Sequence, residues 1–78
     1  MAHRNKVILS VNAPDGVLCV DVFRRPDGSF GFDEFRRDPE DNRGWYSIGH
    51  HGSLRFATEE ETRANAKKTI NWFAELRQ

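Results

Sequence analysis

The sequence predicts an α+β domain, in which an antiparallel β-meander of three or four strands carries one C-terminal α-helix packed on one face. Three observations support this prediction. Apolar and polar residues alternate through the first part of the chain, and a Pro-Asp-Gly trio occurs twice, 12 residues apart. A helix-start signal near the end is followed by apolar residues at helical spacing. We expect a single domain over residues 1–78, because a chain of this length is already small for one domain.

The first two strands are predicted over about residues 5–12 and 17–25, where apolar residues occupy every second position. Between them lies Pro14-Asp15-Gly16. Proline presets φ for a turn, aspartate accepts local backbone hydrogen bonds, and glycine tolerates positive φ. The same trio at residues 26–28 predicts a second turn, which leads into a third strand over about residues 29–37.

Matching the apolar faces gives the expected register, because a slip of one residue would turn every apolar side chain to the other face. The pairs between the first two strands are then Val11 with Leu18, Leu9 with Val20 and Val7 with Val22. The second turn sets Val22 opposite Phe32.

An unbroken third strand would place Glu34 on the core face and Phe35 on the outer face. We therefore predict a β-bulge near residues 33–34, which would return Phe35 to the buried side. The alternative is that the strand continues regularly and Phe35 stays outside.

Residues 38–44 are polar and rich in turn-forming types, which predicts a loop. A fourth strand is expected over about residues 45–49, and residues 54–56 are expected to be extended. The sequence is compatible with either one strand or two between residues 45 and 56.

The helix is predicted over about residues 59–77. Thr58 and Glu61 match the capping box, in which the N-cap side chain and the third helical residue satisfy each other's backbone groups. Acidic residues 59–61 also suit the positive end of the helix dipole. One apolar stripe at helical spacing should face the sheet; it consists of Thr62, Ala66, Thr69, Ile70, Phe73 and Leu76. Trp72 falls at the edge of this stripe.

Charge and composition exclude several classes of protein. The chain has 12 basic and 12 acidic residues, and both halves are balanced, so the basic excess typical of phosphate-backbone binding is missing. No apolar run approaches the roughly 18 residues that a membrane-spanning helix needs, and no signal-peptide pattern is present. The single cysteine, Cys19, favours a reducing cytoplasm.

No metal or cofactor site is predicted. His50 and His51 are adjacent, and neighbouring side chains on a strand point to opposite faces. The acidic stretch that begins at Asp38 resembles the start of a calcium loop. However, Arg43 and Gly49 stand where that loop needs glycine and glutamate. We interpret both segments as solvated loops.

No catalytic residues are predicted either, so we expect a protein that is not an enzyme. The serines lack a nucleophile elbow, and Cys19 lies within a predicted strand. The glycines of residues 28–31 lie in a hairpin, whereas a phosphate-cradling loop precedes a helix.

Arginines interleaved with aromatic residues are the remaining signal. We expect an interaction face formed by Phe23, Arg36, Arg43 and Trp45 on the outer side of the sheet, with Trp72 at the helix edge. The predicted function is a small cytoplasmic, non-catalytic module that binds a protein partner or a second copy of itself. The alternative is nucleic-acid binding through the outer face, by base stacking or groove contact. A purely structural alternative is that arginine stems cover the rings and pair with acidic residues across the sheet.

Two resemblances support the fold. Phe-Gly-Phe-Asp-Glu-Phe-Arg-Arg-Asp at residues 30–38, followed by Trp-Tyr at 45–46 and a helix, is similar to small bacterial proteins of unknown function. That likeness covers about residues 17–76 and implies a fold without an activity. The order of Arg24-Arg25, residues 33–36, Trp45 and residues 56–60 resembles the DNA-binding domain of plant ethylene-response factors. That family reads the major groove with arginine and tryptophan on its sheet. The zero net charge and an insertion at residues 50–55 depart from its pattern.

Overall fold

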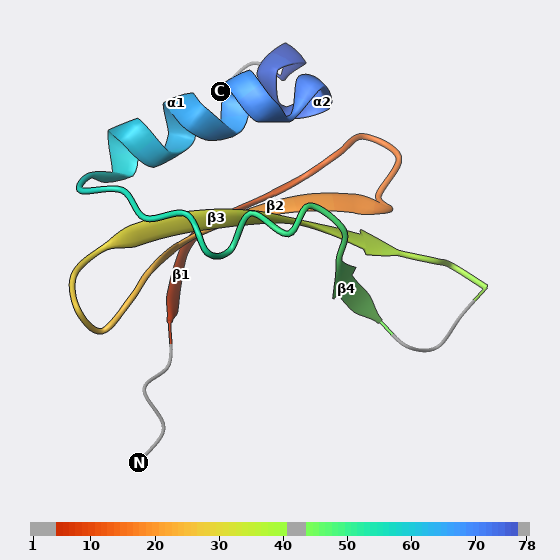
Figure 1. Ribbon diagram of the computed structural model, residues 1–78. Coiled ribbons are helices and arrows are strands. Elements are labelled where there is room, and N and C mark those ends of the chain that lie inside the picture. The colour runs from red at the N-terminus through yellow and green to blue at the C-terminus, as the bar shows by residue number, and fades with distance from the viewer. Residues whose placement is uncertain (1–4, 41–43, 77–78) are drawn as a thin grey trace.

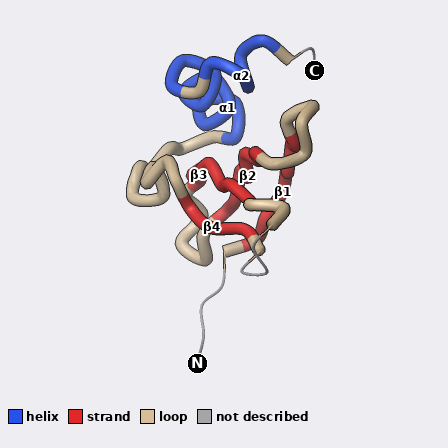
Figure 2. Tube along the Cα trace, turned by 90° about the vertical axis from the view of Figure 1, so that its right-hand side faces the viewer, coloured by secondary structure: helices blue, strands red, loops and turns tan. Residues whose placement is uncertain are grey.

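A four-stranded antiparallel sheet carries two helices on one of its faces. The computed structural model describes residues 5–40 and 44–76. The elements are β1 (Lys6–Asn12), β2 (Leu18–Arg24), β3 (Phe30–Arg37), β4 (Trp45–Ser47), α1 (Glu59–Thr69) and α2 (Asn71–Glu75). The strand order is β1-β2-β3-β4. Both helices lie on the same side of the strands in the two views of Figures 1 and 2, and α1 packs on β2 and β3. The predicted meander followed by a C-terminal helix is thus confirmed.

The two Pro-Asp-Gly segments form the same kind of turn. In each, the glycine N–H donates to the carbonyl three residues earlier at 2.9 Å. The aspartate carboxylate in each accepts from the backbone N–H two residues later, also at 2.9 Å. Gly16 and Gly28 have φ values of 75° and 90°, a conformation that other residues adopt only with strain. The repeated trio therefore determines both reversals of the meander.

Asp27 in the second turn is held ionised by its neighbours. Its Oδ1 accepts from the Ser29 hydroxyl at 2.7 Å and from the Ser29 N–H, and its Oδ2 accepts from Arg55 Nη1 at 2.6 Å. These hydrogen bonds, with those from Ser29 the largest cause, lower the pKa of Asp27 from 3.8 to about 2. The turn is thereby tied to the segment that precedes α1.

The lowered pKa predicts a specific acid sensitivity. A carboxylate whose pKa is lower in the folded state stabilises the fold fully above its unfolded pKa. That stabilisation is lost as the pH falls toward the folded value. We expect the free energy of unfolding to decline between about pH 4 and pH 2. Asp27→Asn should decline less steeply there, as followed by urea unfolding at each pH. Asp15→Asn, in the equivalent turn, is the matched control; equal slopes in wild type and Asp27→Asn would contradict the prediction.

The register between β1 and β2 differs from the expected one by two residues. Val11 lies opposite Val20, and Leu9 lies opposite Val22. The hairpin closes where Ala13 N–H donates to the Leu18 carbonyl at 2.8 Å, so its loop includes one residue beyond the Pro-Asp-Gly trio. Because the shift is even, the apolar residues keep their predicted face.

A bulge does occur, but in β1. The register shifts between Val7 and Leu9, so Val7 lies opposite Phe23 and is 52% exposed. The prediction that Val7 belongs to the core is therefore wrong. The neighbouring Ile8 packs against the core cluster in its place.

The predicted bulge at residues 33–34 is wrong, and the alternative of a regular strand is correct. Pairing between β2 and β3 is unbroken, with Val22 opposite Phe32 as expected. Phe35 consequently lies on the face away from the helices and is half-buried. Glu34 faces the helices, where Trp72 Nε1 donates to its Oε2 at 2.7 Å. This hydrogen bond from the helical side makes a carboxylate tolerable at that position.

The helix begins as predicted, because the Thr58 side chain accepts from Glu61 N–H at 3.1 Å. It does not continue unbroken to residue 77, which lies outside the described residues. Ile70 has extended backbone angles (φ −115°, ψ 104°) and separates α1 from α2. Ile70 and Phe73, at the break and after it, are both buried in the core. Thr69, expected in the apolar stripe, is exposed, and its hydroxyl donates to the Asn65 carbonyl at 2.9 Å.

The core lies between the helices and the sheet. Its buried members are Val20, Val22, Phe32, Ala66, Ile70 and Phe73, with Ile8, Leu9, Val11, Phe56 and Trp72 packed against them. Fully burying a large apolar side chain stabilises the fold by about 1.5–3 kcal/mol relative to exposure. Neither α1 nor α2 is long and apolar enough to cross a membrane, and the described residues contain no other helix.

The segment after β4 follows the edge of β3. β4 ends at Ser47, and within the described residues the only further pairing in this segment is an isolated bridge between Phe30 and Phe56. That bridge has hydrogen bonds of 2.8 and 2.9 Å. Residues 45–56 therefore form one strand and one isolated bridge, and not two strands.

Candidate functional site

The uncovered face is the side of the sheet that carries neither helix (Figure 1). Strand alternation and the observed register place the following residues on it: Val7, Ser10, Asn12, Cys19, Asp21, Phe23, Gly31, Asp33, Phe35, Arg37, Trp45 and Ser47. Two concavities of about 350 and 330 Å³ lie on this face. Both are lined by Asp21 and Phe35, so they adjoin.

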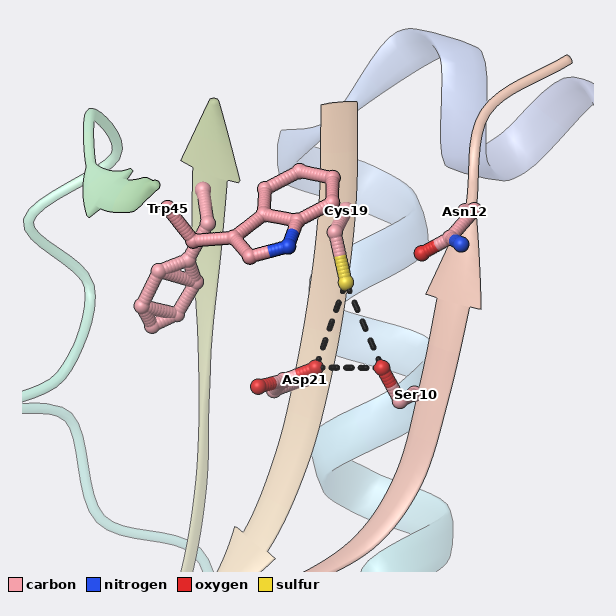
Figure 3. A pocket seen from close by; sticks show the side chains of 6 residues that line it. Ser10, Asn12, Cys19, Asp21 and Trp45 are labelled. Atoms are coloured by element: carbon pink, nitrogen blue, oxygen red, sulfur yellow. Dashed lines mark hydrogen bonds between the residues drawn. The ribbon is translucent and has the colours of Figure 1, made fainter. Parts of the chain in front are cut away.

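The first concavity lies over β1, β2 and the start of β4, with Asn12, Phe35 and Trp45 among its lining residues. Figure 3 shows three polar side chains joined on its floor. Asp21 Oδ1 accepts from Ser10 Oγ at 2.7 Å and from Cys19 Sγ at 3.3 Å. Ser10 Oγ and Cys19 Sγ lie 3.3 Å apart.

This arrangement does not activate the cysteine. Burial is the main cause that raises the pKa of the Cys19 thiol, and the hydrogen bond to the Asp21 carboxylate raises it further. The hydrogen bond with Ser10 acts in the opposite direction. Nucleophilic cysteines have a lowered pKa, because the thiolate is the reactive form. Ser10, Cys19 and Asp21 therefore form a hydrogen-bonded polar floor of the concavity, without an activated thiol.

The second concavity extends from Asn5 and Val7 across Phe23 and Asp33 to Gly52. Asp33 is 9% exposed and ties the segment after β4 to the sheet. Its Oδ2 accepts from Ser47 Oγ at 2.7 Å, and its Oδ1 accepts from the backbone N–H of His51 at 3.1 Å. The Asp33 carboxylate thus ties the end of β4 and the segment after it to β3.

Asp21 and Asp33 lie directly opposite each other on β2 and β3. Like charges at directly opposed positions destabilise a sheet. No lysine or arginine of residues 5–40 and 44–76 forms an ion pair with either carboxylate. The centre of the uncovered face is therefore acidic.

Phe23 is 8% exposed, although no helix covers it. It lies opposite Gly31, and a Cβ at that glycine would come within 2.8 Å of the ring. The Phe23 ring thus covers the space left by Gly31. The guanidinium of Arg25 lies 5.0 Å from its centroid and shields the ring further.

The structure separates the residues predicted to form the interaction face. Phe23 and Trp45 lie on the uncovered face, and Trp45 is 41% exposed. Arg36 lies on the opposite face, next to Asp38 at 3.0 Å, and Trp72 belongs to α2. Arg43 lies outside the described residues. The expected position of Arg36 was wrong because it depended on the bulge that β3 does not have.

Sequence reasoning missed Asp33 and Phe35 for the same reason. In a regular third strand they follow Gly31 at every second position and share its face. Arg37 was also missed; its guanidinium lies 5.1 Å from the Trp45 centroid, directly across the β3–β4 pair. The alternation of Cys19, Asp21 and Phe23 did give the correct outer face of β2.

His50 and His51 do not line these concavities. His50 is exposed and has a φ of 54°, whereas the His51 ring packs 5.1 Å from the Phe32 ring. Within the described ranges, no three His, Cys, Asp or Glu side chains are grouped so that they could hold a metal ion.

No family model matches this chain, and no curated protein or solved structure matches it either.

Proposed function

We propose that this protein is a small non-catalytic module that binds a protein partner, or a second copy of itself, through the uncovered face. The observation that carries the proposal is the pair of adjoining concavities on that face, walled by Phe35 and Trp45. A reducing cytoplasm belongs to the same proposal, because Cys19 is a free, buried thiol.

Exposed apolar side chains on and beside this face support the proposal. Val7 and Trp45 are 52% and 41% exposed, one near each end of the face. Tyr46, Ile48 and Leu54 are also exposed large apolar residues, in β4 and the segment after it. Aromatic residues are enriched in the cores of protein–protein interfaces, where their burial contributes most of the affinity.

Nucleic-acid binding is the weaker alternative. It would use arginines beside aromatic rings, as Arg25 lies over Phe23 and Arg37 over Trp45. Arg36, which was expected to take part, lies on the other face. Asp21 and Asp33 occupy the centre of the uncovered face, where they would repel phosphates.

Site-specific photo-crosslinking tests the proposed interface. A benzophenone amino acid replaces Trp45 on the uncovered face or, as the matched control, Lys68 on the exposed side of α1. In cells that make the protein, we expect protein crosslinks from position 45 and few from position 68. Crosslinks to the chain itself would identify a second copy as the partner. Equal crosslinking from both positions, or none from position 45, would refute the interface.

A further inference from the structure

We propose that the two adjoining concavities receive a lysine or arginine side chain of the protein partner. Asp21 and Asp33 would supply the counter-charge, and Phe35 and Trp45 the aromatic wall. This inference rests on the proposed function, since it names the chemistry of the partner that the uncovered face binds.

Asp21 and Asp33 place two carboxylates at opposed positions on neighbouring strands. Directly opposite positions on antiparallel strands place Cβ atoms about 4.5–5.5 Å apart, close enough for repulsion between Asp21 and Asp33. Within the described part of the chain, every hydrogen bond that these carboxylates accept comes from a neutral donor: two hydroxyls, a thiol and backbone N–H groups. A cation between them would relieve this repulsion.

Asp21 also keeps an oxygen free for a ligand. Its hydrogen bonds from Ser10 and Cys19 both use Oδ1, and no described residue donates to Oδ2. In Figure 3 the second oxygen lies on the side away from Ser10, within the concavity that Trp45 also lines. A charged N–H donor at this oxygen would form a charge-assisted hydrogen bond.

The aromatic wall suits a cation. Phe35 lines both concavities, and Trp45 lines the first. A guanidinium or ammonium group over an aromatic face is attracted by the ring quadrupole. The Arg37 guanidinium already makes a cation–π contact with this ring, 5.1 Å from the Trp45 centroid.

The nearby arginines do not neutralise the carboxylates. Arg37 donates to the Gly16 carbonyl at 3.2 Å, and Arg25 donates to the carbonyls of Phe30 and Leu54 at 3.0 Å. Neither arginine lines a concavity. The described residues that line the site thus include two carboxylates and aromatic rings but no cation.

An amide-resolved NMR titration with paired peptides tests this proposal. One short acetylated and amidated peptide carries a central arginine among glycines, and its match carries neutral citrulline, which is nearly isosteric. We expect the arginine peptide to shift the amides of Asp21, Asp33 and Phe35 and the Trp45 indole signal. Citrulline should bind about tenfold more weakly, because it loses the charge-assisted hydrogen bonds.

Variants localise the effect. Asp21→Asn should weaken arginine-peptide binding by about tenfold, and Asp15→Asn, an exposed turn carboxylate outside both concavities, should not. Arg4 precedes Asn5 in sequence and could compete, so the titration is repeated on Arg4→Ala. Binding seen only in Arg4→Ala still supports a cation site. The proposal would be overturned if the citrulline peptide bound as tightly as the arginine peptide, or if the chemical-shift changes lay outside the concavities. It would also be overturned if neither wild type nor Arg4→Ala showed chemical-shift changes with arginine and lysine peptides.

The two proposals fail separately. Crosslinks from position 45 with a silent titration would retain the interface and remove the basic partner. Binding of the arginine peptide at the concavities, without crosslinks in cells, would retain the cation site and remove the proposed partner protein.

Discussion

Phe32→Ala is expected to lower the free energy of unfolding by about 3–5 kcal/mol. Phe32 is fully buried in β3, and its ring lies 5.1 Å from the His51 ring and 6.0 Å from the Phe56 ring. Its loss would leave a cavity where the sheet, the helices and the segment after β4 meet. Because small domains have only about 5–15 kcal/mol in total, most of the stability would be lost.

Guanidinium unfolding followed by circular dichroism measures this effect. Val7→Ala is the matched control, because Val7 is a strand residue that is 52% exposed. It should change the free energy of unfolding by no more than about 0.5 kcal/mol. Similar midpoints for the two variants would mean that the core is not centred on Phe32.

Arg25→Ala is expected to lower the free energy of unfolding by about 2–3 kcal/mol, although Arg25 forms no ion pair with any described residue. The guanidinium donates to the carbonyls of Phe30, Gly52 and Leu54 and thereby joins β3 to the segment that leads into the helix. It also covers the Phe23 ring. Alanine would both release the segment that leads into the helix and expose the Phe23 ring.

Denaturant unfolding and hydrogen exchange check this prediction. Protection of the backbone amides of residues 52–56 should fall more than protection in β2. Arg24→Ala, one residue earlier and exposed, should have little effect. Arg25→Lys should recover only part of the loss, because an ammonium group lacks the planar fork that reaches several carbonyls. Full recovery with lysine would show that charge alone, rather than the fork, is needed.

One wrong prediction in β3, the bulge at residues 33–34, changes which residues are expected in the candidate site. A carboxylate at a core-facing position is unfavourable, so Glu34 predicts a bulge in β3. That bulge would place Phe35 and Arg36 on the wrong faces, because pairing between β2 and β3 is unbroken. The deciding contact is the hydrogen bond from Trp72, 38 residues away in sequence. No local pattern contains that contact, although regular alternation from Phe32 would have placed Asp33 and Phe35 correctly.

Local sequence patterns specify the meander, the two turns, the helix start and most of the core. These features depend on local chemistry: Pro-Asp-Gly presets the turns, Thr58 caps the helix, and alternation selects the buried face. The position of the β1 bulge, the interruption of the helix and the side chains that meet on the uncovered face are visible only in the folded structure. At Ile70 the helix is interrupted although the apolar spacing continues through it. The opposition of Asp21 and Asp33 likewise depends on strand register, and register is set by contacts between distant segments.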